Sequence, residues 1–510
     1  MKFLTATAAI AGAASAYSVQ APLKDSTPPS NSRISSSLKK TLISSEAIQA
    51  NIKGEALMAR AEELYKIAKL SEPTYGHPTR VIGSPGHLAT LDYIKSELAK
   101  LGDYYTVSTQ DFEAFAGSVE DSFLIVNHVK LNGSAMSLSP STKGSKAVYG
   151  KLVPVANGGC TAGDYTSLVS GSIAFIQRGT CSFGTKSELA GAAGAVAAVI
   201  YNSEPGDLHG TLGTPKPNHI ATLGLSLEEA EPILDQLNLG KWVSGIAMVN
   251  STVKVLNTTN ILAQTTEGDA ENCVMLGGHS DSVSEGPGIN DDGTGTLSLL
   301  EVAKQLSQFS VNNCVRFGWW AAEEEGLLGS DYYVATLPKE ENRKIRLFMD
   351  YDMMASPNFA YQVYDANNDE NPNGSGDLKQ LYIDWYNSKG LNYTLIPFDG
   401  RSDYDAFIRN GIPGGGIATG AEGIKTAEEE GMFGGVKGDW YDPCYHQLCD
   451  DVSNVNETAW VMNTQLIAHS VATYAASFEG FPKRALDDAV SMSDTKKAYA
   501  PKYHGDYLFI

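Results

Sequence analysis

Three short motifs between residues 273 and 326 carry the residue types that a hydrolytic metal centre needs. They are Gly277-Gly278-His279-Ser280-Asp281, Asn290-Asp291-Asp292-Gly293-Thr294-Gly295 and Ala321-Ala322-Glu323-Glu324-Glu325-Gly326. Each one combines imidazole or carboxylate groups with a glycine-rich turn. These groups are the ligands of hydrolytic zinc centres. The pattern therefore predicts a metallohydrolase whose remaining ligands lie elsewhere in the chain.

The first two motifs each allow a structural interpretation beside the catalytic one. His279 and Asp281 are two residues apart, so in an extended strand their side chains point the same way. Asp281 can then hold the second ring nitrogen of a metal-bound His279. For this motif alone, however, a histidine that is hydrogen-bonded at a strand end is the favoured interpretation. Asp291 and Asp292 open a helix, where capping accounts for one carboxylate. A carboxylate that bridges two cations would account for the other.

The third motif follows the apolar run 315–320, which reads as a buried central strand. At least one of its three glutamates should therefore meet a cation or a proton, and a metal ligand beside a general base is the simplest assignment. Two further candidates lie downstream. Asp352 ends another strand-like run, and His446 lies in a small loop between Cys444 and Cys449 that a disulfide would lock.

Alternating strand-like and helix-like runs after residue 260 would position these groups. The runs are 274–278, 297–306, 315–320, 345–350, 378–388 and 412–419. This alternation indicates an α/β layer with a largely parallel sheet, whose sites form at the carboxyl ends of the strands. Earlier in the chain, apolar spacing predicts amphipathic helices over 48–68 and 88–101. His87 lies in the loop between them, and we interpret it as structural.

Composition bounds the class of protein. A chain of 510 residues favours two domains plus tails, and a net charge of −21 argues against nucleic acid or an anionic membrane as a partner. Residues 1–16 have the form of a signal peptide, 17–45 read as a flexible or pro-segment, and 481–510 as a C-terminal tail. No later segment has the ~20 apolar residues needed to span a bilayer.

Entry to the secretory route favours disulfides for the six cysteines. Six cysteines allow 15 pairings. Spacing suggests Cys444 with Cys449 and Cys273 with Cys314, which leaves Cys160 with Cys181, but sequence alone does not decide. Six sequons predict a glycosylated surface; they begin at Asn132, Asn250, Asn257, Asn373, Asn392 and Asn456.

Six motifs resemble, in the same order, those of the M28 family of zinc aminopeptidases. They are H-x-D at 279–281, N-D-D-G at 290–293, A-A-E-E-x-G-L-x-G-S at 321–330, D-M-x-x-S-P-N at 352–358, G-R-S-D-Y at 400–404 and D-P-C-Y-H-x-x-C-D at 442–450. Separately, residues 178–195 resemble the protease-associated domain that is inserted into several peptidases. The resemblance implies a zinc-exopeptidase fold, which is a largely parallel mixed sheet flanked by helices. The peptidase domain would cover 46–124 and 256–480, and the small β-rich insert 125–255.

The resemblance also implies two zinc ions per chain. His279 and Asp352 fall on the ligands of one, Glu324 and His446 on those of the other, and Asp291 on the bridge. Further roles carried over in this way are the general base for Glu323, an oxyanion donor of some members for Tyr445, a substrate contact for Arg401 and support of His279 for Asp281. Glu325 stands where a relative has an apolar residue, so the choice among the three glutamates rests on alignment to residues 326–330.

The function implied is an aminopeptidase that removes N-terminal residues, of an apolar, Leu-like kind, from peptides and proteins. We expect a monomer that is secreted or, alternatively, vacuolar. One alternative is a glutaminyl-cyclase-like member with a single zinc, and another is a receptor-like homologue without metals. The full ligand set argues against both.

Overall fold

The computed structural model describes residues 40–203, 206–484, 503–504 and 507–508. The predicted signal peptide and most of the predicted segments 17–45 and 481–510 lie outside the described residues. Residues 40–45 of the predicted flexible or pro-segment are among the described residues. Leu42 pairs with Ser310, and Ile43 is buried, so the folded part already includes these residues.

A mixed, largely parallel sheet forms the centre of the peptidase part, as predicted. Its parallel strands lie in the order β14-β11-β9-β10. Beyond β14 come β12, which is antiparallel to it, and then β13; beyond β10 comes the antiparallel β8. The bounds are β8 Ser244–Thr265, β9 Asp269–His279, β10 Asn313–Trp320, β11 Ile345–Tyr351, β12 Gln362–Tyr364, β13 Thr394–Ile396 and β14 Gly414–Ala418.

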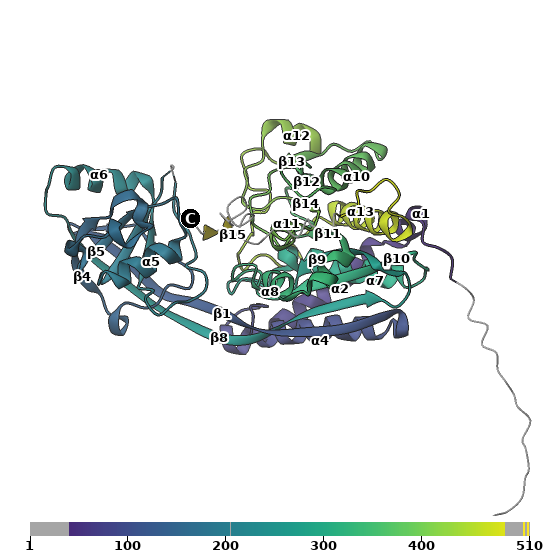
Figure 1. Cartoon of the computed structure of the whole chain (residues 1–510), viewed down its shortest axis with the longest axis horizontal. Coiled ribbons are helices and arrows are strands. Elements are labelled where there is room, and N and C mark those ends of the chain that lie inside the picture. The colour runs from purple at the N-terminus through teal and green to yellow at the C-terminus, as the bar shows by residue number, and fades with distance from the viewer. Residues whose placement is uncertain (1–39, 204–205, 485–502, 505–506, 509–510) are drawn as a thin grey trace, which may run out of the picture. The chain divides into compact units, whose positions relative to one another are not determined.

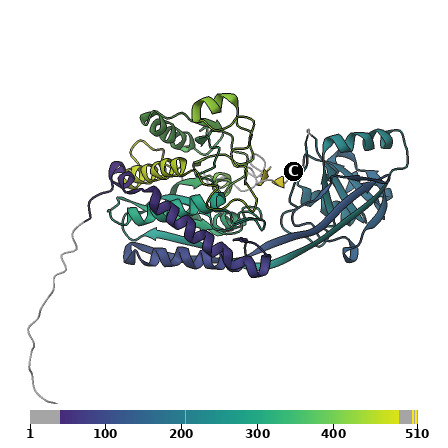
Figure 2. The same cartoon turned by 180° about the vertical axis from the view of Figure 1, so that it is seen from behind.

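Helices cover both faces of this sheet (Figure 1). Figure 2 gives the view from behind, in which α2 and α4 lie close together. The α-helices are α1 Ser45–Asn51, α2 Gly54–Ala68, α3 Glu72–Tyr75, α4 Pro85–Ala99, α7 Gly295–Leu306, α8 Leu328–Thr336, α9 Lys339–Lys344, α10 Ser375–Ser388, α11 Tyr404–Arg409, α12 Ala427–Phe433 and α13 Glu457–Ala476. The short helical segments η1 Lys69–Ser71, η2 Gly102–Tyr104 and η7 Ile289–Thr294 join them.

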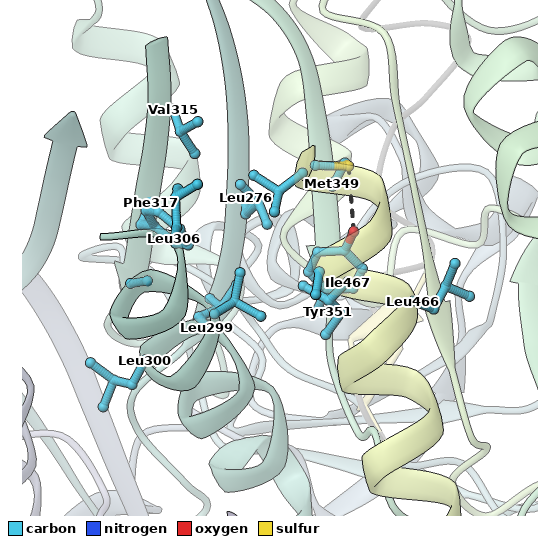
Figure 3. Packing of buried hydrophobic residues seen from close by; sticks show 14 of the residues in the cluster. Leu276, Leu299, Leu300, Leu306, Val315, Phe317, Met349, Tyr351, Leu466 and Ile467 are labelled. Atoms are coloured by element: carbon cyan, nitrogen blue, oxygen red, sulfur yellow. Dashed lines mark hydrogen bonds between the residues drawn. The ribbon is translucent and has the colours of Figure 1, made fainter. Parts of the chain in front are cut away.

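The alternation of side chains along the strands separates two apolar cores. On β9, Leu276 belongs to one core and Met275 to the other. Figure 3 shows the first core, in which leucines of α7 and α13 pack against the strands. The second core is built around α8 and α11. Burial on both faces explains why these strands read as continuous apolar runs in the sequence.

Two long strands leave the peptidase sheet and continue into a second group of strands. β1 (Tyr105–Val126) pairs with β8 along nearly the whole length of both, and the register shifts between Val119 and Asp121. The remaining elements are β2 Val129–Leu131, β3 Ser134–Ala135, η3 Lys143–Ser145, β4 Val148–Pro154, η4 Ala156–Gly159, η5 Ala162–Asp164, η6 Ser167–Val169, β5 Ile173–Gln177, α5 Phe183–Ala192, β6 Ala197–Tyr201, β7 Thr222–Leu225 and α6 Leu227–Asn238; a separate pair joins β15 Tyr503–His504 to β16 Tyr507–Leu508. Two apolar clusters pack within the elements from β2 to α6 and the adjoining ends of β1 and β8.

The six cysteines form three disulfides, which are Cys160–Cys181, Cys273–Cys314 and Cys444–Cys449. This is the pairing that the spacing favours. One helix prediction was wrong in detail, because the pattern over 48–68 is divided into α1 and α2. The chain is extended at Ile52 and Lys53, and Ile52 is buried at this break. Among the described residues, no helix is both long and apolar enough to cross a membrane.

Candidate metal centre

The candidate ligands meet at the carboxyl edge of the parallel strands. His279 is the last residue of β9, Asp352 directly follows β11, and Glu323 follows β10 by three residues. Since these strands are parallel neighbours, their carboxyl ends lie side by side, where sites of α/β sheets form. Asp291 enters from η7, and His446 from the loop closed by Cys444–Cys449.

Asp291 faces a different histidine with each of its carboxylate oxygens. Its Oδ1 lies 3.2 Å from Nε2 of His279, and its Oδ2 lies 3.1 Å from Nε2 of His446. Each histidine also lies near a second predicted ligand. Asp352 Oδ1 lies 3.7 Å from His279 Nε2, and Glu324 Oε2 lies 3.1 Å from His446 Nε2. The five predicted ligands therefore form two groups that share Asp291.

The three adjacent glutamates have different surroundings. Glu323 and Glu324 line one cavity together with Asp291, Asp352 and His446, whereas Glu325 does not line it. Glu323 Oε2 lies 3.9 Å from His279 Nε2, the longest of these approaches. Proximity alone would also group Glu323 with His279 and Asp352 as three possible ligands. We separate it from the ligands because Asp291 lies closer to His279 and also reaches His446.

Asp281 holds the backbone of two glutamates and lies near His279. Its two oxygens accept the backbone N–H groups of Glu323 and Glu324, each at 3.3 Å. Its Oδ1 lies 3.7 Å from Nδ1 of His279, which is on the predicted side of the ring but too long for a hydrogen bond. Asp281 thus links the end of β9 to the loop after β10.

Left-handed backbone conformations occur at three non-glycine residues of this centre. Ala322 has φ +61°, Met353 +55° and His446 +56°. Such values are costly for residues with a Cβ, and they cluster at functional sites where the surrounding structure holds them. Ala322 precedes Glu323, and Met353 follows Asp352. The chain therefore turns sharply at the points where it presents these carboxylates.

Two aspartates behind Asp291 fix the backbone around it. Asp292 accepts the N–H of His279 at 3.1 Å, of Gly295 at 2.9 Å and of Met353 at 3.1 Å. Capping is therefore the role of Asp292, and Asp291 is left to face the histidines. Asp450 accepts the N–H groups of Asn290 and Asp291 at 2.9 and 3.1 Å. We assigned Asp450 no role from sequence, although it closes the motif that contains His446.

Arg401 and Tyr445 lie in the same cavity as the candidate ligands. The Tyr445 ring stacks on the His446 imidazole, with 3.8 Å between ring centroids. Arg401 Nη2 donates to Glu422 at 2.7 Å and to the Tyr445 hydroxyl at 3.4 Å. Next to Arg401, the Ser402 hydroxyl donates to Asp352 Oδ2 at 2.9 Å. Sequence reasoning assigned no role to Ser402 or Glu422, although Ser402 is part of the G-R-S-D-Y motif.

Burial of several carboxylates together perturbs their pKa values. Burial raises the pKa of Glu324 to about 7 and that of Asp352 to about 6, and it raises the pKa of Glu323 well above its usual value. Burial opposes ionisation of Asp291 too, but hydrogen bonds from His279 and His446 hold its pKa below the usual value. A nearby dication would favour the charged forms of all four carboxyl groups.

The spacing of the candidate ligand atoms fits zinc. Bonds of about 2.0–2.2 Å place neighbouring ligand atoms of a tetrahedral zinc about 3.3–3.6 Å apart. The four separations centred on the two histidines are 3.1, 3.1, 3.2 and 3.7 Å. In addition, Asp352 Oδ1 and Glu324 Oε1 are buried without a hydrogen-bond partner among the described residues. Two oxygen–nitrogen sites suited to a cation therefore lie next to each other.

The cavity over this centre has a volume of about 300 Å³. Apart from the charged groups, its walls are mainly apolar and come from β12, β13, β14 and nearby loops; they include Met353, Tyr364, Ile396, Pro397 and Ala418. His87, by contrast, is not part of it. His87 is fully buried at the start of α4, where its Nε2 lies 3.1 Å from the Ser280 hydroxyl. Its interpretation as a structural histidine agrees with this position.

A mixed α/β sheet with two adjacent candidate cation sites at its carboxyl edge is the arrangement expected of a metal-dependent hydrolase. Sequence comparison identifies the family within it. A profile of Peptidase family M28 matches residues 260–471, and one of the PA domain matches residues 148–233.

Close relatives extend the match over most of the chain. Aminopeptidase Y of Saccharomyces cerevisiae is 52% identical over 92% of this chain and 87% of its own length. Leucine aminopeptidase 2 of Trichophyton equinum is 42% identical over 91% of both chains. Among solved structures, an aminopeptidase from Aneurinibacillus sp. strain AM-1 superposes with a TM-score of 0.70 at 26% identity, and the match covers 87% of this chain and 98% of that one. The chain therefore belongs to peptidase family M28, and it is a hydrolase whose relatives are aminopeptidases.

Proposed function

We propose that this chain is a two-zinc aminopeptidase that removes N-terminal residues from peptides and proteins with a free amino terminus. The observation that carries the proposal is the placement of Asp291 between two histidines, 3.2 Å from one and 3.1 Å from the other. His279, Asp291 and Asp352 would hold one zinc ion. Asp291, Glu324 and His446 would hold the second.

Zinc ions in these positions would supply a Lewis acid for the scissile carbonyl and activate water as the nucleophile. Glu323 is 4% exposed and reaches the cavity beside His279, where a carboxylate can accept a proton from that water. The same side chain can return the proton to the leaving amine. Glu323 is thus the general base of the proposal, and the Tyr445 hydroxyl, from a residue that lines the same cavity, would donate to the developing oxyanion.

The selectivity for N-terminal residues follows from the charge of the cavity. Glu323 adds a carboxylate beyond those assigned to the metals, and its negative charge favours the α-ammonium group of a peptide. The apolar wall that includes Met353, Ile396 and Ala418 suits an aliphatic side chain of the first residue. A Leu-like preference is therefore the expected specificity, and Arg401 is placed at the same cavity to contact substrate.

The decisive variant is Glu323→Gln, assayed on a panel of aminoacyl anilides with the zinc content counted by native mass spectrometry. We expect kcat to fall at least about 10²-fold while two zinc ions stay bound, because an amide cannot take the proton. Glu325→Gln is the matched control, since the neighbouring Glu325 does not line the cavity. Near-normal turnover of Glu323→Gln would show that the base is assigned to the wrong residue.

Metal counting also decides between the proposal and its alternatives. One bound zinc would favour a glutaminyl-cyclase-like member, and none would favour a receptor-like homologue. The paired arrangement of all five ligand side chains supports two. A chelator should abolish hydrolysis of Leu anilide, and restored zinc should recover it.

We also infer that the protein enters the secretory pathway and acts as a monomer outside the cell or, alternatively, in the vacuole. Three disulfides support an oxidising route. Of the six sequon asparagines, Asn132, Asn257, Asn373 and Asn392 are exposed, whereas Asn250 and Asn456 are half-buried. Digestion with an endoglycosidase and the resulting shift in mass would test the modification.

A further inference from the structure

We propose that Arg80 is a positioning residue of the metal centre, which holds the segment between His279 and Asp291 in its working shape. Arg80 lies about two hundred residues before these ligands, in the short connection between α3 and α4. No motif of the metal centre includes it. The inference rests on the proposed function for the identity of the metal, but its evidence is the packing of Arg80 itself.

The guanidinium of Arg80 is fully buried and donates to backbone carbonyls at both ends of one segment. Its Nη1 donates to the carbonyl of Ser280, directly after His279. Its Nε donates to Pro287 O at 2.8 Å, and its Nη2 to Gly288 O at 2.5 Å. One planar side chain therefore ties the start of the segment to its end, three residues before Asp291.

Residues 280–288 contain no helix or strand, so these contacts replace the hydrogen bonds of regular structure. The neighbouring residues of the same connection add two more. The N–H of Arg80 donates to the Ser282 hydroxyl at 2.9 Å, and the Thr79 hydroxyl donates to Val283 O at 2.9 Å. Much of the ordering of the segment thus comes from residues 79 and 80.

The approach of Arg80 to the end of the segment requires a glycine. Gly288 has φ +58°, and a Cβ there would lie 3.0 Å from Arg80 Nη2 and 2.2 Å from Asp291 O. The carbonyl oxygen of Asp291 and the guanidinium of Arg80 therefore both pack against the Cα atom of Gly288. A shift of Arg80 must displace the turn that presents Asp291.

The positive charge of Arg80 lies among several acidic side chains of the centre. The carboxylates of Asp281, Asp291, Asp292 and Asp450 all interact with the buried guanidinium. A lysine would keep one positive charge here, but it lacks the rigid fork that reaches three carbonyls at once. The geometry thus points to the fork, more than the charge, as the feature that sets the spacing of His279 and Asp291.

Arg80→Lys tests the inference in the full-length chain. Zinc is removed by dialysis against a chelator, and its rebinding is measured by competition with a chelating dye, together with the melting temperature of the metal-free protein. We expect zinc affinity to fall about 10–100-fold, which is the usual effect of removing a group that orients metal ligands. We also expect the variant to keep the wild-type KM in assays at saturating zinc.

Arg60→Lys is the matched control. Arg60 is also buried, but it pairs with Glu301 at 3.0 Å and Glu97 at 2.9 Å, on α7 and α4. This variant should lower the melting temperature and leave zinc affinity unchanged. If Arg80→Lys behaved like Arg60→Lys, Arg80 would have only a role in stability and the inference would be overturned.

Two further outcomes are informative. If Arg80→Lys did not fold, Thr79→Val would take its place, because it removes a single hydrogen bond to the same segment. Zinc affinity about 3-fold weaker would support the inference, and unchanged affinity would overturn it. If the wild-type chain itself bound no zinc, the proposed function would fail, whereas wild-type zinc binding with normal affinity in both variants would reject only the role of Arg80.

Discussion

Removal of the disulfide Cys444–Cys449 should loosen the loop that presents His446. The two cysteines are five residues apart, and His446 lies between them in a left-handed conformation, with φ +56°. In the chain-entropy description, ordering an open loop of this length costs about 2 kcal/mol more conformational entropy than ordering the closed loop. If the opened loop must be ordered again when zinc binds, this cost reduces the binding free energy of the zinc ion held by His446. We therefore expect about 30-fold weaker binding of one of the two zinc ions.

The assay is a zinc titration of the double variant Cys444→Ser, Cys449→Ser against a competing chelator, with the two equivalents resolved. Only one of them should weaken, because the ligands of the other come from β9, η7 and the end of β11. The double variant Cys160→Ser, Cys181→Ser is the control, since this disulfide contributes nothing to the cavity and its loss should lower stability alone. If the first double variant bound both zinc ions within about 3-fold of wild type, we would conclude that Tyr445 stacking and Asp450, and not the disulfide, order the loop.

Two other predictions concern a hydroxyl and an imidazole. Tyr445→Phe should lower kcat about 10²-fold with both zinc ions retained, because one donor to the oxyanion is lost. Tyr441→Phe should not lower kcat, since the Tyr441 hydroxyl donates to Glu429 at 2.7 Å. Equal kcat values for the two variants would contradict the role of Tyr445 as a donor. Burial lowers the pKa of His469 from 6.5 to about 4, so as the pH falls this imidazole is protonated in the unfolded chain before it is protonated in the folded one. The free energy of unfolding is therefore highest above pH 6.5 with respect to this group, and it decreases as the pH falls toward 4. At pH 5 this loss is about 2 kcal/mol. Urea unfolding at pH 7 and 5 should show a smaller loss for His469→Gln than for wild type, and equal losses would refute it.

The sequence predicted the sheet well because its strands are buried on both faces. The runs that correspond to β9, β10 and β11 are continuous and apolar, and their ends coincide with the motifs of His279, Glu323 and Asp352. The strand pair β1–β8 was not predicted, because these strands lack a continuous apolar run. Their side chains change from exposed to buried several times along their length.

Sequence motifs indicate the candidate ligands, Asp281 and the Cys444–Cys449 disulfide, whereas the other residues that hold the ligands were not predicted. His279 and Glu324 stand in motifs with a recognisable order, which a single sequence displays. Arg80 and Asp450 act through backbone atoms of distant segments, as in the bonds from Arg80 to the carbonyls of Ser280 and Pro287, and a backbone carbonyl is present whatever the residue type of the partner. Such contacts leave no pattern in the chain, so the structure was needed to find them.

The centre is built almost entirely where regular structure ends, and this explains its need for support. Asp291, Glu323, Asp352 and His446 all lie outside β-strands, and left-handed residues adjoin or include three of them. Each turn is held by a different interaction. The Asp281 carboxylate holds the glutamates, Ser402 holds Asp352, and the disulfide and Asp450 hold the His446 loop. The residues of these interactions come from different parts of the chain, so a change at any one of them should displace only a subset of the ligands. The two proposed metal positions share Asp291, and for that reason Arg80 is the support whose loss we expect to weaken both.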